Sequence, residues 1–277
     1  MKNNNVDIFI CTHKDFDNCP NSPEYKIISK NLLSGFYNLG VVYEGDDFFS
    51  NYQKMLNEFT YINYVYENYP LKDYVGFCHY RRYFQFYDKI PNMDNMFRKY
   101  DIIITEPKIY NLPLTDPLVQ SFLKIKEKLK LSVRDQFGFW HNVEDLDLVD
   151  DVISLLHGKD SWMLKKWKEY KAQYIFYGCN MFIMKSNDFR KYMSWLIPIV
   201  KLYISKTGIK NFDDAINWVK KNEKKYDKTN TPNVDNFYEY QARFIGLVVE
   251  RLTSFYIWLY FKNPKIYKIK DFSLQGK

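Results

Sequence analysis

The chain has 277 residues, enough for one large domain, or one domain with a helical annex, around a sizeable core. Its formal charge of +7 favours anionic partners such as nucleotides, nucleic acid or an acidic membrane face. Charge interrupts every apolar run well short of the roughly 20 residues of a membrane span, and the start shows no signal-peptide core, so a soluble protein is expected. Cys11, Cys19, Cys78 and Cys179 lack zinc-ligand spacing, which predicts free thiols in a reducing cytoplasm.

The first eighty residues predict the rhythm of a nucleotide-binding α/β domain. Val6–Cys11 forms an apolar strand that ends in the polar turn 12–15, and 41–43 forms a short strand closed by the acidic turn 44–47. Apolar residues at three- to four-residue steps predict a helix over 51–69 that Pro70 ends. A buried strand over 74–78 follows, giving the order β, β, α, β.

The later elements are more helical. Strands are predicted at 100–105 and 177–184 and helices at 116–131, 143–156, 162–170, 188–197 and 238–260. Residues 135–142 are expected to form a loop. The polar, lysine-rich stretch 205–236 is expected to be a mobile excursion.

The strand at 74–78 runs straight into His79, Tyr80, Arg81 and Arg82. In open α/β sheets ligands bind beyond the carboxyl ends of the strands, and paired guanidiniums match phosphate oxygens, so this stretch is a candidate anion site. A second interpretation stays open. Arg81 and Arg82 then lie on opposite faces of a continuing edge strand and form surface salt bridges, with the tyrosines packed as wedges.

Other polar residues allow both functional and structural interpretations. His13 ends the first strand, and as adjacent strand ends His13 and His79 are expected to face one cleft. His141 precedes a helix and fits a capping or packing role as well as a ligand role. Glu250 and Arg251 interrupt an apolar helix, so the carboxylate must be exposed, paired with an arginine or catalytic.

Several enzyme classes lack their motifs here. The sequence contains no dinucleotide-binding glycine pattern, P-loop, nucleophile elbow or H-E-x-x-H. Two D-x-D triplets occur, at 15–17 and 145–147, but neither follows a strand in the place expected of a metal site, which favours chance matches over metal binding.

Motifs along nearly the whole chain resemble those of a family, formerly of unknown function, of capsular polysaccharide and O-antigen glycosyltransferases. They are Cys11-Thr-His-Lys14; Gly45-Asp46 with Asn57, Glu58, Thr60 and Tyr64; Asp73 to Phe84 with its HYRRYF run; His141 to Leu146; Asn180 to Met184; and Gly246 with Glu250-Arg251. The segment after Asp46 is abbreviated and the excursion at 205–236 departs from the pattern, which bears on donor contacts and acceptor choice respectively.

The resemblance implies a GT-A-like α/β fold with a mixed sheet flanked by helices and a helical C-terminal part. We expect residues 1–185 to form the nucleotide-sugar-binding core and 186–277 a mainly helical acceptor-side part of the same domain. The implied reaction moves a sugar from a nucleotide donor, UDP-linked and of galactose or galactofuranose type among the possibilities, to a capsular or lipopolysaccharide glycan. A soluble protein at the cytoplasmic side, in peripheral contact with the inner membrane, fits such an acceptor.

The resemblance and the residues together predict the site. The expected nucleotide and donor contacts are Thr12, His13, Lys14, Asp46, Glu58 and Tyr80, with His79, Arg81 and Arg82 on the diphosphate. Glu250 is the preferred general base, ahead of Asp145 and Glu58. The expected acceptor-side residues are His141, Asn180 and Arg251.

The arginines and the histidine would stabilise the departing diphosphate as a divalent ion does, so neither metal ligands nor a cofactor are predicted, although Mn²⁺ or Mg²⁺ stays open. Inversion is the simpler stereochemistry, and retention stays open too. The competing class is a non-catalytic basic module for nucleic acid or glycan. Aromatics at core periodicities and charge at a strand end favour the enzyme, without nucleic acid as a partner.

Overall fold

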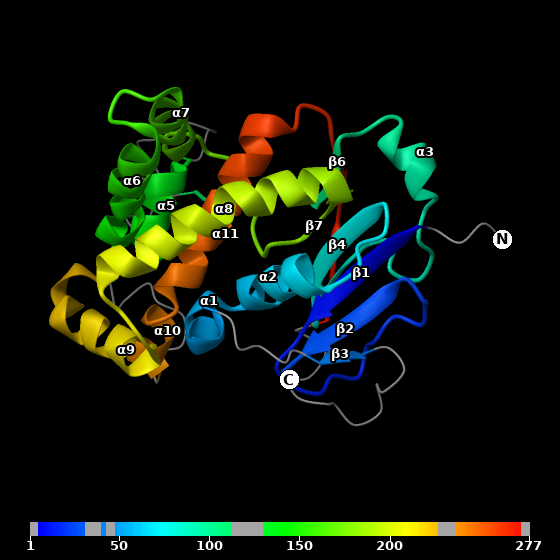
Figure 1. Ribbon diagram of the computed structural model, residues 1–277, viewed down its shortest axis with the longest axis horizontal. Helices are drawn as coiled ribbons and strands as arrows, with labels where there is room; N and C mark the ends of the chain where they lie inside the picture. Colours follow the sequence, from blue (N-terminus) through cyan, green and yellow to red (C-terminus); the bar gives the residue numbers. More distant parts are fainter. Residues whose placement is uncertain (1–4, 31–39, 43–47, 112–129, 227–235, 273–277) are drawn as a thin grey trace, which may run out of the picture.

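One mixed β-sheet organises the part of the chain that the computed structural model describes, residues 5–30, 40–42, 48–111, 130–226 and 236–272. Its strand order is β3-β2-β1-β4-β7-β6-β8, and β5 joins β4 to β9 at one end (Figure 1). The strands are β1 (Val6–Cys11), β2 (Tyr25–Ser29), β3 (Gly40–Val42), β4 (Tyr74–His79), β5 (Arg82–Phe84), β6 (Ile102–Thr105), β7 (Phe182–Lys185), β8 (Pro264–Tyr267) and β9 (Ile269–Asp271). The expected fold class, a mixed α/β sheet flanked by helices, is confirmed.

The direction of the strands decides which chain segments meet at one edge of the sheet. β3, β2, β1 and β4 run parallel to one another, as do β6 and β8. β7 runs antiparallel to both β4 and β6. The segments that follow β1, β4 and β6 therefore emerge at the same edge as the segment that precedes β7.

The central strands are apolar on both faces because each face is covered. In β1, Phe9 and Cys11 pack into the core beneath the helices, whereas Ile8 and Ile10 join a second cluster on the opposite face. Gly76 of β4 allows β7 to approach closely, since a Cβ atom there would lie 2.6 Å from Cγ1 of Ile183. The predicted strands at 6–11 and 74–78 are confirmed, whereas β2, β8 and β9 were not predicted.

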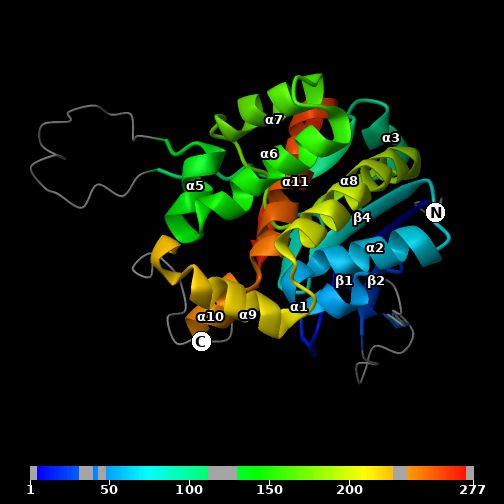
Figure 2. The ribbon, with the colours of Figure 1, turned by 60° about the vertical axis from the view of Figure 1, so that its left-hand side comes forward.

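The helices form a layer over one face of the sheet and a group beyond its edge (Figures 1 and 2). They are α1 (Gln53–Leu56), α2 (Glu58–Asn68), α3 (Met93–Phe97), α5 (Val133–Trp140), α6 (Val143–His157), α7 (Trp162–Lys171), α8 (Ser186–Thr207), α9 (Phe212–Lys221), α10 (Phe237–Gln241) and α11 (Phe244–Tyr260), with the short turns η1 (Ser50–Tyr52) and η2 (Glu223–Lys225). None of the helices in the described ranges has both the length and the apolar character that a membrane span requires.

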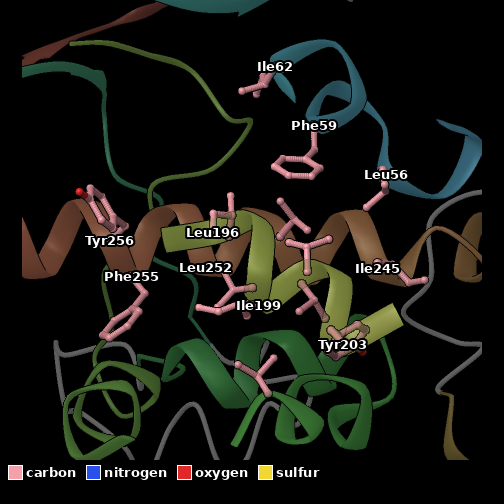
Figure 3. Close-up of a cluster of buried hydrophobic side chains, with 14 of the residues drawn as sticks. Leu56, Phe59, Ile62, Leu196, Ile199, Tyr203, Ile245, Leu252, Phe255 and Tyr256 are labelled. Atoms are coloured by element: carbon pink, nitrogen blue, oxygen red, sulfur yellow. The ribbon is translucent and has the colours of Figure 1, made fainter. Parts of the chain in front are cut away.

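Helices α8 and α11 form the centre of the helical core. Figure 3 shows Leu196 and Ile199 of α8 beside Leu252 of α11, with Phe59 of α2 approaching from above. These side chains are fully buried. Because α11 also contacts α1, α6 and α7, it joins the layer over the sheet to the outer helices.

Two elements expected to be irregular are helical. Residues 133–140 form α5, because the Ser132 side chain caps its start by accepting a hydrogen bond from the Asp135 amide. Within 205–236, α9 buries Ala215 and Val219 below a polar face. Polar composition hid this apolar stripe, so the expectation of an excursion was wrong for 212–221.

Two predicted helices are broken at residues near the carboxyl edge. The helix expected over 51–69 divides at Asn57, whose φ is +53°, into α1 and α2. The helix expected over 238–260 divides between Gln241 and Phe244. At 177–184 only 182–185 is a strand, because Cys179 and Asn180 have positive φ values of 69° and 48°. The helix predicted over 116–131 lies almost entirely outside the described residues.

Candidate active site

The loops that follow β1 and β4 lie side by side at the carboxyl edge of the sheet. Cys11 is paired with His79 in the parallel register, so the residues after each strand become neighbours. The edge of the His13 ring faces the Tyr80 ring at a centroid separation of 5.4 Å. The expectation that His13 and His79 end adjacent strands is thus confirmed.

Tyr80 is the centre of a group of titratable side chains, which we call the Tyr80 cluster: His13, Lys14, Glu58, His79, Tyr80, Arg81 and Arg243. The Tyr80 ring is buried and stacks on His79 at 4.5 Å. The ammonium of Lys14 and the guanidinium of Arg81 lie 5.8 and 4.7 Å from its centroid. The phenol ring thus holds two flexible cations at one place by cation–π attraction.

Thr12 fixes the loop that carries His13 and Lys14. Its buried hydroxyl donates to the Lys14 carbonyl at 2.7 Å and accepts from the Lys14 amide at 3.2 Å. The Thr12 hydroxyl thus makes its hydrogen bonds within the loop itself. Thr12 therefore positions its neighbours, whereas His13 and Lys14 are exposed.

Glu58 is the carboxylate of the Tyr80 cluster. Its Oε1 lies 3.3 Å from Nε2 of His79. Burial opposes ionisation of Glu58, but the hydrogen bond and charge of His79 outweigh it and hold the pKa of Glu58 below its ordinary value. Glu58 therefore stays charged and orients the His79 ring.

Arg243 also belongs to this cluster, although it was not predicted. It lies just before α11, and its Nε donates to Oδ1 of Asn57 at 2.8 Å. The helix can approach this closely because residue 246 is glycine: a Cβ atom there would lie 2.6 Å from both the Met55 carbonyl oxygen and Asn57 Nδ2. Arg243 precedes Glu250 by two helical turns, which is the signal that was missed.

The potential around the Tyr80 cluster is positive. Partial desolvation lowers the pKa of His13 below its ordinary value, and the charges of Lys14, His79, Arg243 and Arg81 lower it further. His13 therefore remains neutral at pH 7, beside cations from three segments of the chain. Such a surface is suited to a polyanion.

Arg81 and Arg82, which the sequence suggested as paired forks on a diphosphate, have different partners in the structure. Tyr80 and Arg81 form the turn between β4 and β5, and Arg81 remains exposed over Tyr80. The Nε of Arg82 instead donates to Asp271 Oδ2 at 3.0 Å, and its Nη1 lies 3.5 Å from the Cys179 sulfur. The salt-bridge interpretation is therefore correct for Arg82, which continues into strand β5.

Glu250 and Arg251 of helix α11 lie beside the carboxyl edge of the sheet, near the turn that carries Cys179. Glu250 Oε1 accepts from the Cys179 amide at 2.9 Å, and Oε2 lies 3.2 Å from Nη1 of Arg251. Arg251 is buried, with its guanidinium 4.1 Å from the centre of the Phe176 ring. The expected arginine pairing of Glu250 thus exists, and it leaves the Glu250 side chain 18% exposed.

Of the residues expected on the acceptor side, the structure buries all three. Nδ1 of His141 lies 2.8 Å from Gln241 Oε1, and burial, aided by the charge of Arg251, lowers the pKa of His141 to about 3. His141 is therefore a neutral core residue. Asn180 is buried in the positive-φ turn before β7. Asn180 and Arg251 thus lie in or beside the turn that carries Cys179, whereas His141 packs in the core against Gln241 and Phe137.

Asp145 lies among the outer helices and not at the carboxyl edge. We call its surroundings the Asp145 cluster: Asn142, Asp145, Trp218 and Tyr226. The carboxyl accepts from the Tyr226 hydroxyl at 2.7 Å and from Trp218 Nε1 at 3.3 Å, and it is 2% exposed. Burial raises the pKa of Asp145 to about 7. Because a general base must reach its substrate, this buried and hydrogen-bonded position favours a structural role for Asp145 over the expected catalytic one.

Asp46 lies outside the described residues. Among the residues that are described, no group of three or more His, Cys, Asp or Glu side chains is arranged to hold a metal ion. In the second D-x-D triplet, Asp147 pairs with Arg134 at 2.6 Å and with Lys171 at 2.9 Å. Independence from metal stays a prediction.

Comparison with known proteins places the chain in a family. The family model for a domain of unknown function, DUF4422, matches residues 7–219. The chain belongs to the DUF4422 family. The bifunctional glycosyltransferase WbbM, in an apo structure, is similar over 98% of this chain and 46% of its own, with a TM-score of 0.63 and 20% identity. The likeness shows a shared fold, and this chain spans about half the length of WbbM. A search of curated proteins gave no match.

Proposed function

We propose that this DUF4422 chain is a GT-A-like glycosyltransferase that moves a sugar from a nucleoside-diphosphate donor to a glycan acceptor. The observation that carries the proposal is the Tyr80 cluster, where cations from three segments meet at the carboxyl edge of parallel strands. Ligands of open α/β sheets bind at this edge. The fold shared with a bifunctional glycosyltransferase supports the same reaction class.

In this proposal the cations of the Tyr80 cluster bind the diphosphate of the nucleotide sugar, and uncharged groups hold the rest of that ligand. Arg81, Arg243 and Lys14 supply positive charge, and the exposed His13 ring, packed against Tyr80, supplies an aromatic surface for the nucleoside. Fixed cations stabilise the charge that grows on a departing diphosphate, which is the role a divalent metal has in other transferases. We therefore propose a metal-independent reaction.

Glu250 is the proposed general base. Its carboxylate is held by the Cys179 amide and by Arg251, and it stays partly exposed at the edge where the strands end. A single base facing an acceptor hydroxyl favours inversion at the transferred sugar. UDP is the proposed nucleotide, with a galactose-type sugar, and the proposed acceptor is a capsular or lipopolysaccharide glycan, reached from the cytoplasmic face of the membrane.

A thermal-shift panel tests the proposal. The chain is heated with UDP, GDP, CMP and dTDP sugars, each with and without Mn²⁺, and a ligand that binds the native state should raise Tm. We expect one nucleotide base to stabilise the chain without Mn²⁺. A shift that requires Mn²⁺ would contradict metal independence. Stabilisation by oligonucleotides alone would favour a non-catalytic nucleic-acid module.

A further inference from the structure

A second pair of cations lies beyond the Tyr80 cluster, on the side of Glu250. The ammonium of Lys108 and the guanidinium of Arg82 both point at the sulfur of Cys179, from 3.4 and 3.5 Å. Lys108 follows β6 and Arg82 follows β4, so the two cations come from different strand ends at the same edge. Cys179 lies in the turn before β7, which brings a third segment to this point.

The acceptor that these cations share is uncharged at neutral pH. Burial raises the pKa of Cys179, and the nearby charge of Glu250 raises it further, against the lowering effect of Lys108 and Arg82. A thiol is only a weak hydrogen-bond acceptor. Arg82 has a carboxylate partner in Asp271, whereas the hydrogen bond that the Lys108 ammonium donates ends on the neutral sulfur. The Glu250 carboxylate also attracts Lys108, but it is paired with Arg251. The three cations Lys108, Arg82 and Arg251 therefore face two carboxylates, Asp271 and Glu250.

The Lys108–Arg82 pair adjoins both the Tyr80 cluster and the proposed base. Arg82 is the residue after Arg81, so the hairpin joins the two sites directly. On the other side, the amide of the same Cys179 is bound by Glu250 at 2.9 Å. An anion held by Lys108 and Arg82 is thus continuous with one held by Arg81, and it is the nearer of the two to Glu250.

These contacts match the two phosphates of a nucleoside diphosphate. The α-phosphate carries the nucleoside, and the β-phosphate carries the sugar that is transferred, so the β-phosphate must lie closer to the base. We propose that Lys108 and Arg82 bind the β-phosphate of the donor, while the Tyr80 cluster binds the α-phosphate. The inference rests on the proposed function, and it adds Lys108 as a residue that contacts the leaving group.

The proposed step balances without any further reactant. The acceptor hydroxyl oxygen forms a bond to the anomeric carbon, and its proton passes to Glu250. The bond between the anomeric carbon and the β-phosphate oxygen breaks, and its electron pair stays on that oxygen. Lys108 stabilises the new charge on the departing nucleoside diphosphate.

Isothermal titration with UDP and UMP tests the assignment, because the two ligands differ only by the β-phosphate. We expect Lys108→Met to weaken UDP binding about 10- to 100-fold, as for loss of a charged hydrogen bond, and to change UMP binding by less than about threefold. Lys108→Arg, which keeps the charge, should retain most of the preference for UDP. Lys165→Met, on the exposed face of α7, is the matched control and should bind both ligands like the unchanged chain.

The outcomes separate this inference from the proposed function. If the unchanged chain prefers UDP to UMP but Lys108→Met keeps that preference, the β-phosphate assignment is wrong and the glycosyltransferase proposal stands. If the unchanged chain binds no nucleoside diphosphate from the thermal-shift panel, the proposed function itself fails. If the thermal-shift panel shows a preference for a nucleotide base other than uracil, the diphosphate and monophosphate of that nucleoside replace UDP and UMP. If Lys108→Met is unstable on heating, Lys108→Gln takes its place in the same titration.

Discussion

The Tyr80 cluster and the Asp145 cluster both place titratable groups among aromatic rings, but the charged groups are mainly exposed in the first and buried in the second. In the Tyr80 cluster, exposed cations surround one carboxylate at the ends of parallel strands. In the Asp145 cluster, a buried carboxyl is bonded by neutral donors from α9 and from the segment after it. A sequence pattern selected Asp145 as a possible general base. Because its carboxyl is buried and hydrogen-bonded within its own cluster, we expect it to stabilise the fold instead.

The two clusters also differ in what a ligand would change. The exposed cations of the Tyr80 cluster repel one another, and a bound anion would reduce this repulsion. The cluster is therefore arranged to favour anion binding. The Asp145 carboxyl is enclosed by protein, so we expect it to respond to a change of pH rather than to a ligand. Substitutions in the first cluster should therefore affect binding and turnover, and substitutions in the second should affect stability.

The largest expected effect is on turnover. Glu250→Gln removes the proposed base while keeping an acceptor for the Cys179 amide, so the rate should fall about 100- to 10,000-fold with donor affinity little changed. Steady-state kinetics with the donor from the panel, on protein shown by circular dichroism to be folded, gives the measurement. A loss of less than about tenfold would be incompatible with general-base catalysis by Glu250.

Asp145→Ala should lower the free energy of unfolding by about 2–4 kcal/mol, because the Tyr226 hydroxyl and the Trp218 indole both lose their buried acceptor. Denaturant titration measures it, with Asp160→Ala on the exposed α6–α7 turn as control. Turnover per folded molecule should remain unchanged. A loss of activity at unchanged stability would return Asp145 to the list of catalytic candidates.

The stability of the unchanged chain should also depend on pH through Asp145. Its folded pKa of about 7 lies above the value of an exposed carboxyl, so the folded state holds the proton more tightly. This contribution is fully present below about pH 4 and is lost as the pH rises to about 7, by an amount on the order of a few kcal/mol. Asp145→Asn should flatten that part of the profile in thermal unfolding at pH 5 and pH 8. Equal profiles for the two proteins would refute the raised pKa.

Arg243→Met should weaken donor binding about tenfold, since one cation is lost from the Tyr80 cluster. Raised salt should reduce the affinity of the unchanged chain more than that of the variant. Titration of the diphosphate at two ionic strengths measures both effects. Arg190→Met, on the exposed face of α8, offers a control in which neither should appear.

The smallest effect expected is the pH dependence of donor binding. His13 has a lowered pKa in the free protein, and a bound anion should raise it, so binding takes up a proton. Affinity should then increase a few-fold as the pH falls between the free and bound pKa values of His13. His13→Asn should remove this increase. If the variant keeps it, another group is responsible.

The elements that were predicted correctly are those whose burial repeats in the sequence. Val6–Cys11, apart from Asp7, and 74–78 are apolar runs, and both are central strands; Leu146, Val149 and Ile153 predicted α6 by their spacing. The breaks at Asn57 and before α11 were not predictable in this way. They arise where α11 crosses the α1–α2 junction at Gly246, a contact between residues almost 190 positions apart that leaves no local pattern.

The same limit applies to the site. Motif order predicted that His13, His79 and Tyr80 lie together, because their places follow directly from adjacent parallel strands. It did not separate Arg81 from Arg82, since the hairpin turn at Tyr80–Arg81 sends consecutive side chains to different partners. Lys108 carried a usable signal, a lysine after the end of a buried strand, but its convergence on Cys179 depends on the unusual backbone of the turn before β7.

Helix α11 sets a fixed spacing across the site. Arg243 and Glu250 are seven residues apart, which is two turns on nearly the same side of one helix and roughly 10 Å along its axis. A rigid helix of this kind keeps the proposed donor-binding residue and the proposed base at one separation, whatever the loops around them do. Any side chain larger than hydrogen at position 246 would push the helix away from the Met55 carbonyl and Asn57, and would therefore disturb both residues together.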